Sequence, residues 1–180
     1  MDLTRRGLFR LAGTTGLAAA AGTVLAAVPA SVAQAGQAGW RWCRLCQGLW
    51  FAGNPTLGVC PAAGTAGHSF VGSGNYTVPS ADDFIHGQVG WFWCYRCQGL
   101  WYALNGTHGA CPAGPGGHEQ TGSDLYAPDV NTPNDQGNWR WCFECQGLWF
   151  AGNHTRGVCP VLGTGGHGMA SSGIYYLSKD

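Results

Sequence analysis

The chain has 180 residues and carries equal numbers of basic (Lys, Arg) and acidic (Asp, Glu) side chains, nine of each. Its few cations are scattered, which argues against a nucleic-acid partner, because phosphate binding needs a concentrated basic patch. With 31 glycines and no helical periodicity beyond the first 35 residues, the composition argues against a helical protein. We therefore expect an all-β protein.

Residues 1–35 have the pattern of an export signal. Arg5 and Arg6 begin a basic segment, residues 11–28 are mostly apolar, and the stretch ending at Ala35 is typical of a signal-peptidase site. Residues 4–10 resemble the twin-arginine export consensus, which implies a protein that is exported already folded. An ordinary secretory signal with a chance Arg-Arg pair remains the alternative. Glycines and Pro29 interrupt the apolar run, so we expect cleavage and no permanent membrane anchor.

Cleavage after Ala35 would leave a slightly acidic, extracellular protein. Lys plus Arg would fall from nine to six and Asp plus Glu from nine to eight, so the net charge would be −2.

Three tandem repeats occupy the remainder of the chain. They span residues 37–87, 88–135 and 136–180, and each begins with the pattern Gln-x-x-Trp-x-Trp-Cys-x-x-Cys-Gln-Gly-Leu-Trp. No stretch is left over for a separate catalytic domain. Within each repeat we expect a Trp-x-Trp strand, a Leu-Trp-aromatic strand, a Gly-x-Cys-Pro turn and a tyrosine-bearing strand.

The alternation of residues 40–43 predicts how the first strand of each repeat is oriented. Trp40 and Trp42 would share one face, whereas Arg41 and Cys43 would lie on the other. The same alternation recurs in repeats 2 and 3.

Two arrangements of the repeats are open. One is a closed, pseudo-threefold assembly resembling a β-trefoil, and the other is a row of three zinc-ribbon-like beads. A unit of this size is too small for an independent hydrophobic core, so it needs metal, its neighbours or both. The near absence of linkers and of a distinct capping repeat favours closure.

Each repeat also contains three cysteines and one regularly spaced histidine. The spacing is Cys-x₂-Cys-x₁₃-Cys-x₇-His in repeats 1 and 3, and the last interval is one residue shorter in repeat 2. Three thiolates and one imidazole complete a tetrahedral zinc shell with no open position, so we expect three structural zinc ions and no metal-bound water. The predicted ligands are Cys43, Cys46, Cys60 and His68; Cys94, Cys97, Cys111 and His118; and Cys142, Cys145, Cys159 and His167.

A disulfide or redox protein is the competing interpretation, because exported proteins often contain disulfides. It would leave one cysteine of each repeat, Cys60, Cys111 and Cys159, without a partner in its own repeat, and it would not explain the histidines. A thioredoxin-like motif would also need a helix after its first cysteine, which Gln-Gly-Leu-Trp does not favour.

Three tryptophans per repeat are more than a chain of this length usually carries. Most of them should pack in the core. Adjacent aromatic residues on a strand point to opposite faces, so one member of each pair after the Cys-x-x-Cys turn could remain exposed and stack on sugar rings. On this basis Trp50, Trp101 and Trp149 are the predicted ligand-binding residues, and repetition would give avidity on a polymer.

The Trp-x-Trp-Cys-x-x-Cys-Gln-Gly-Leu string resembles tandem repeats in secreted proteins of high-GC Gram-positive bacteria, where they occur alone or beside hydrolases. The resemblance covers residues 37–180 and implies the repeat unit, not an activity. No nucleophile–base pair can be named. Asp82 and Asp83 beside His86 form the one local acid–base cluster, which a solvated turn also explains. We expect a secreted, zinc-stabilised, non-catalytic binding module for cell-wall or other extracellular polysaccharide. The alternative is extracellular zinc buffering or storage.

Overall fold

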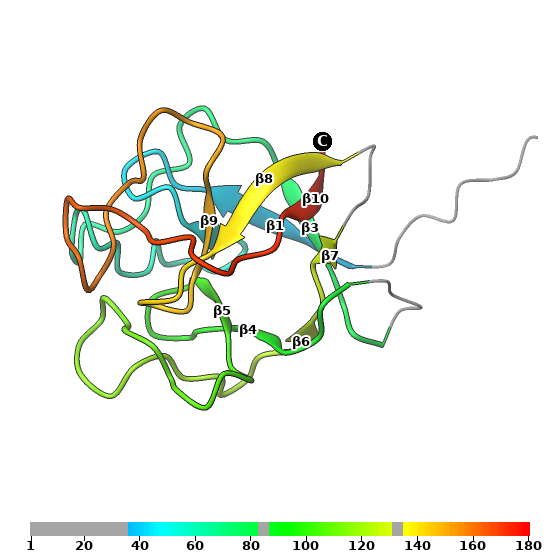
Figure 1. Cartoon of the computed structure of the whole chain (residues 1–180), viewed down its shortest axis with the longest axis horizontal. Coiled ribbons are helices and arrows are strands. Elements are labelled where there is room, and N and C mark those ends of the chain that lie inside the picture. Colours follow the sequence, from blue (N-terminus) through cyan, green and yellow to red (C-terminus); the bar gives the residue numbers. More distant parts are fainter. Residues whose placement is uncertain (1–35, 83–86, 131–134) are drawn as a thin grey trace, which may run out of the picture. The chain divides into compact units, whose positions relative to one another are not determined.

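Short β-strands joined by loops make up residues 36–82, 87–130 and 135–180, which are the residues described by the computed structural model (Figure 1). These ranges contain no helix, and the expectation of an all-β protein is confirmed. The strands are β1 (Gly36–Trp42), β2 (Leu49–Phe51), β3 (Tyr76–Pro79), β4 (Trp91–Trp93), β5 (Leu100–Tyr102), β6 (Leu125–Tyr126), β7 (Asp129–Val130), β8 (Gln136–Trp141), β9 (Leu148–Phe150) and β10 (Tyr175–Lys179).

The predicted export signal, residues 1–35, lies outside the described residues. Among the residues that are described, no helix has the length and hydrophobicity needed to cross a bilayer.

Each repeat begins with the same antiparallel hairpin. In repeat 1, Trp40 pairs with Phe51 and Trp42 with Leu49. The hairpins β4–β5 and β8–β9 have the same register. The Cys-x-x-Cys segment forms the turn of each hairpin, so it is held between two strands. The loops that follow β2, β5 and β9 extend to one side in Figure 1.

The alternation predicted for the first strand is confirmed. Trp40 is fully buried in the main hydrophobic core and Trp42 packs against that core, whereas Cys43 belongs to a separate cluster around the first metal site. The main core draws on all three repeats and includes Trp91 and Trp139. No repeat therefore has a complete core of its own.

The third strand of each repeat begins or ends at a tyrosine and joins the repeats to one another. β3 pairs with β1 of its own repeat and with β10 of repeat 3, and β10 also pairs with β7 and β8. β6 pairs with β4, and its residue Tyr126 forms an isolated bridge with Ser80 at the end of β3. Within the described residues, repeats 1 and 3 supply three strands each, and repeat 2 has the short β7 as a fourth.

The repeats close on one another through contacts that run once around a pseudo-threefold axis. The backbone N–H after each buried tryptophan donates 2.8–2.9 Å hydrogen bonds to the glutamine carbonyl of the next repeat. These bonds are Phe51 to Gln98, Tyr102 to Gln146, and Phe150 to Gln47. The third bond joins the last repeat to the first. The arrangement is therefore closed and trefoil-like in symmetry, and the repeats do not stand as separate beads.

A second closed set of contacts involves the tyrosines. Each tyrosine hydroxyl donates to the side-chain oxygen of the glutamine that opens a neighbouring repeat, and each ring meets a core tryptophan of that repeat edge-on at 5.1–5.3 Å. The pairs are Tyr76 with Gln136, Tyr126 with Gln37, and Tyr175 with Gln88. The glutamine that begins each repeat thus takes part in closure.

Candidate metal centres and binding clefts

The Cys-x-x-Cys turn is shaped by its own backbone before any metal binds. In repeat 1, Cys43 N–H donates to the Gly48 carbonyl at 2.9 Å, and Gln47 N–H donates back to the Cys43 carbonyl at 2.8 Å. Gln47 has a positive φ of 67°, which turns the chain sharply enough to bring both sulfurs to one side. Gln98 and Gln146 have the same φ in repeats 2 and 3.

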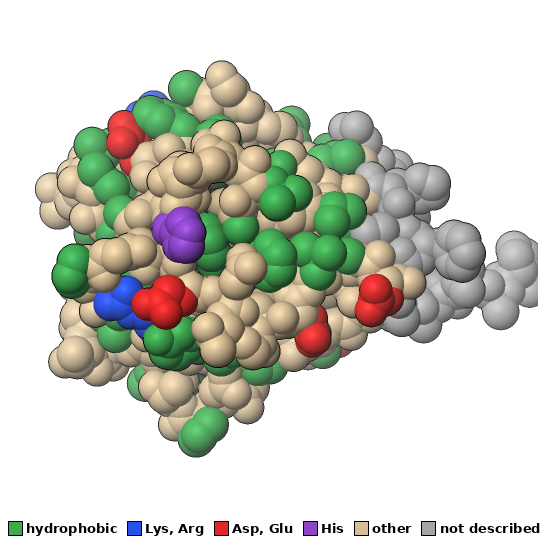
Figure 2. All heavy atoms as spheres, turned by 90° about the horizontal axis from the view of Figure 1, so that it is seen from below, with side chains coloured by type: hydrophobic (Ala, Val, Ile, Leu, Met, Phe, Trp, Pro, Cys, Tyr) green, Lys and Arg blue, Asp and Glu red, His purple; other side chains and the backbone are tan. Residues whose placement is uncertain are grey.

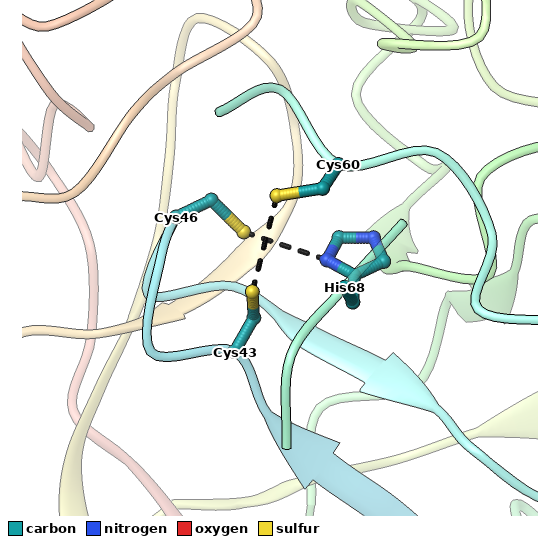
Figure 3. Close-up of side chains that lie close together, drawn as sticks. All are labelled: Cys43, Cys46, Cys60 and His68. Carbon is teal, nitrogen blue, oxygen red and sulfur yellow. Dashed lines mark hydrogen bonds between the residues drawn. The ribbon is translucent and has the colours of Figure 1, made fainter. Parts of the chain in front are cut away.

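The predicted ligands of each repeat converge. In every repeat one donor atom from each of the three cysteines and the histidine lies within 4.8 Å of the others, and all four residues are buried. Figure 3 shows the first site, where Cys43 and Cys46 project from the turn toward Cys60 and His68 of the following loop. The fold thus brings the third cysteine and the histidine, which are distant from the turn in the sequence, next to the two cysteines of the turn.

The spacing of these atoms fits a tetrahedral metal ion. Thiolates about 2.3 Å from zinc stand about 3.8 Å apart in a regular tetrahedron, well beyond the ~2.05 Å of a disulfide. In repeat 1 the Cys43 and Cys60 sulfurs are 3.9 Å apart, and the Cys46 sulfur lies 3.6 Å from His68 Nδ1. The corresponding distances are 3.9 and 3.5 Å in repeat 2 and 4.0 and 3.5 Å in repeat 3. Each site can therefore hold one metal ion, and three thiolates with one imidazole suit zinc.

Each histidine is fixed by a bond to the next repeat. His68 Nε2 lies 3.1 Å from the Cys97 carbonyl oxygen, which can only accept, so Nε2 carries the proton and Nδ1 faces the sulfurs. The same 3.1 Å contact joins His118 to Cys145, and His167 to Cys46. The ligand of one site thereby holds the turn of the next site in place.

Mutual hydrogen bonding among the ligands separates their pKa values. Hydrogen bonds from Cys46 and Cys60 lower the pKa of Cys43 strongly, whereas the bond with Cys43 raises the pKa of Cys46. Burial alone would lower the pKa of His68, but hydrogen bonds with Cys43 and Cys60 outweigh it and raise that pKa to about 9. A metal-free site thus retains protons, which a divalent cation must displace on binding.

All nine cysteines are free thiols in the structure. The disulfide and redox interpretation therefore gains no support from it. The third cysteine of each repeat, which that interpretation left unpaired, lies in the four-residue cluster.

The prediction that Trp50, Trp101 and Trp149 form an exposed platform is wrong. Their exposed fractions are 0, 2 and 1%. Each indole stacks on the histidine ligand of its own repeat, with ring centroids 5.2–5.3 Å apart and planes within about 21°. Adjacent residues on β2 do point to opposite faces, but the metal-binding loop covers the face that carries Trp50. These tryptophan rings therefore line the metal centres and cannot stack on a sugar.

Other aromatic rings do reach a cleft. An open cleft of about 550 Å³ lies where repeats 2 and 3 meet, and we call it the aromatic cleft. Its lining includes the half-buried rings of Tyr102 and Trp141, the amides of Gln88 and Asn105, and Ser171. Two side chains of this lining are held in place by Gln146, because its Oε1 accepts hydrogen bonds from both Trp141 Nε1 and Asn105 Nδ2 at 3.2 Å.

A second cleft of about 470 Å³ lies within repeat 2, and we call it the Glu119 cleft. Its lining includes Phe92, His108, Glu119, Gln120 and Thr121. Neither cleft was predicted from the sequence. For the Glu119 cleft, the available signal was the divergence of repeat 2 from its neighbours at these positions, whereas the aromatic cleft is lined mostly by residues that the repeats share.

The structure describes only one residue of the predicted acid–base cluster. Asp82 is exposed, and its partners Asp83 and His86 lie outside the described residues.

No protein-family model, curated protein or solved structure matches this chain.

Proposed function

We propose that this protein is a secreted, non-catalytic binding module, stabilised by three zinc ions, that recognises cell-wall or other extracellular polysaccharide through the aromatic cleft. The observation that carries the proposal is the juxtaposition of Tyr102 and Trp141 with two amides, those of Gln88 and Asn105, that are only partly hydrogen-bonded within the protein, in one open cleft. Sugar rings combine an apolar face with a rim of hydroxyl groups, and aromatic faces bordered by amides complement both.

The polar groups of the cleft are oriented but not saturated. Gln88 accepts a hydrogen bond from Tyr175 through its side-chain oxygen, which leaves its NH₂ group for a ligand. Asn105 donates to Gln146 and leaves its side-chain oxygen for a ligand. A sugar would therefore meet one fixed donor and one fixed acceptor, and little side-chain ordering would oppose binding.

Export by the twin-arginine route is part of the proposal. The buried Cys₃His sites support it, because a domain that needs metal to fold benefits from folding before it leaves a compartment that supplies the metal. The same burial disfavours zinc buffering, since exchange of an ion enclosed by four buried ligands requires the site to open.

The proposal is tested by sedimentation of the zinc-loaded protein with insoluble peptidoglycan, cellulose and chitin. The double variant Tyr102→Ala/Trp141→Ala should lose at least tenfold in affinity for the polymer that the unaltered protein binds, which corresponds to ~1.4 kcal/mol or more.

The repeats provide a matched control. Phe150 and Trp42 hold the equivalent positions where repeats 3 and 1 meet, and Trp42 Nε1 bonds to Gln47 as Trp141 Nε1 bonds to Gln146. The variant Phe150→Ala/Trp42→Ala should lose comparable stability but keep binding. Absence of binding to all three polymers, or equal losses in the two double variants, would contradict the proposal.

A further inference from the structure

We infer that the polysaccharide-binding surface has two subsites separated by Leu104. The protein would then bind an internal stretch of a neutral, hydroxyl-rich chain instead of a single terminal sugar. The inference rests on the proposed function and specifies its ligand. It is based on the relation between the aromatic cleft and the Glu119 cleft.

Leu104 lines both clefts, which makes them neighbours. The strand alternation explains why they lie on either side of this residue: Tyr102 faces the aromatic cleft, whereas Trp101 and Ala103 line the Glu119 cleft. Leu104 is 64% exposed, the highest value among the large hydrophobic side chains described. A chain that occupies both clefts must cross Leu104, whose apolar surface can contact a sugar face.

The Glu119 cleft offers the same chemistry as the aromatic cleft, with more acceptors. The Phe92 ring is half-buried and lies 6.5 Å from Trp101. The His108 Nδ1–H donates to the His118 carbonyl oxygen at 3.1 Å, which leaves Nε2 as an acceptor. Glu119 pairs with Arg96 at 3.3 Å through Oε1 and accepts from the Tyr95 hydroxyl at 3.1 Å through Oε2, and each carboxylate oxygen can still accept a further hydrogen bond. Acceptors beside an aromatic ring suit hydroxyl donors of a neutral sugar and disfavour an anionic one.

Repeat 2 is the repeat that departs from the other two at the positions forming this surface. Repeat 2 has Phe92 where repeats 1 and 3 have arginine, and Leu104 where they have glycine. It also has His108 at a position where neither of the other repeats has histidine. Where they have Phe70-Val71 and Met169-Ala170, repeat 2 has Gln120-Thr121. The shared positions maintain the scaffold, so changes gathered on one surface of one repeat point to a task that the other repeats do not share.

Figure 2 shows this face, which lies over β4, β5 and β6. Hydrophobic side chains border a histidine, and an acidic and a basic side chain lie together nearby. The other charged side chains visible on this face are mostly acidic and lie farther from the histidine, and the surface between them is uncharged. The face is therefore suited to a neutral chain.

The test measures affinity by calorimetry for β-1,4-linked N-acetylglucosamine and glucose oligomers, from mono- to hexasaccharide. We expect affinity to rise about tenfold or more between di- and tetrasaccharide in the series that binds, as the second subsite fills. The variant Gln120→Phe/Thr121→Val, which introduces the residues of repeat 1, should lose most of that gain.

The reciprocal variant Phe70→Gln/Val71→Thr is the control. It makes the opposite exchange at equivalent positions of repeat 1, outside both clefts, and should keep the full dependence on chain length. If oligomers bind without dependence on length, or if the repeat 2 variant keeps the gain, the two-subsite inference is overturned while the proposed function stands. If neither series binds and Tyr102→Ala/Trp141→Ala has no effect on polymer binding, both fail.

Discussion

At the scale of single residues, two kinds of position with a positive φ can be compared. Some are glycines where the backbones of neighbouring repeats meet, and one is a serine that lines the aromatic cleft. Gly157 has φ +67°, and a Cβ placed there would lie 2.1 Å from the carbonyl oxygen of Cys46 in the first repeat. Gly58 and Gly109 approach the carbonyl oxygens of Cys97 and Cys145 in the same way. Glycine at these positions allows the backbones of neighbouring repeats to come close enough for the histidine bonds to form.

Ser171 is the contrasting case. It has φ 60°, whereas the equivalent positions in repeats 1 and 2 are Gly72 and Gly122, with φ 78° and 74°. A non-glycine residue in this region carries strain of roughly 1–2 kcal/mol, and Ser171 lines the aromatic cleft. Strain retained at a cleft is consistent with a role for the hydroxyl in binding.

The substitution Ser171→Gly tests this role. Relief of strain should offset the greater freedom of glycine in the unfolded chain, so stability is retained or rises by up to about 1 kcal/mol. Polysaccharide affinity should fall about three- to tenfold, as expected for the loss of one hydrogen bond. Denaturant unfolding and calorimetry on the same zinc-loaded sample give both values. Unchanged affinity would show that the hydroxyl does not contact the ligand.

At the scale of elements, the Cys-x-x-Cys turn does more than hold two sulfurs. The glutamine that follows it is buried and bonds in several directions. Gln98 donates to the Tyr95 carbonyl at 2.9 Å and accepts from Trp93 Nε1 at 3.2 Å within its own repeat. It also accepts from Asn54 Nδ2 of repeat 1 at 2.7 Å. One side chain therefore links the turn, the hairpin and the neighbouring repeat.

We expect Gln98→Ala to be strongly destabilising, because this buried side chain makes several hydrogen bonds. The substitution removes three hydrogen bonds and leaves the Trp93 and Asn54 donors without their acceptor, at a cost of about 2–4 kcal/mol. Asn54→Ala, which removes only one of the three bonds, should cost about 1 kcal/mol. Urea unfolding of the zinc-loaded variants measures the difference, and equal losses would mean that the turn does not depend on this glutamine.

At the scale of the whole molecule, the metal sites are parts of one ring. His68 binds the first site through Nδ1 and holds Cys97 of the second turn through Nε2, and the same link leads from the third site back to Cys46. The main core also combines side chains from every repeat. Filling one site therefore orders the turn that forms the next.

This arrangement predicts cooperative metal uptake. Zinc added below stoichiometry to the metal-free protein should give empty and three-ion species with little of the one- and two-ion forms, because partial filling leaves the ring open. Cys111→Ser, which removes one ligand of the second site, should lower occupancy at the other two sites as well. Native mass spectrometry measures both effects. Random filling, or a variant that binds two ions at full affinity, would show that the sites are independent.

The sequence by itself determined the repeat unit, the strand character and the metal ligands. The Cys-x-x-Cys spacing places two sulfurs on one tight turn by local geometry, and the threefold recurrence of Cys60 and His68 at nearly constant distance identifies the remaining ligands. Alternation also assigned Trp40 and Trp42 to one face correctly. These features depend on residues that are close in the chain or are repeated in register.

Only the tertiary structure decided which aromatic residues are accessible and how the repeats meet. Trp50 and Phe51 lie on opposite faces of β2, as alternation requires, but a metal loop covers one face and the main core receives the other. The bond between His167 and Cys46 joins residues 121 positions apart. The aromatic cleft likewise combines Tyr102 with Trp141 of the next repeat. Periodicity states which side of a strand a residue occupies, whereas exposure depends on what distant segments bring against that side.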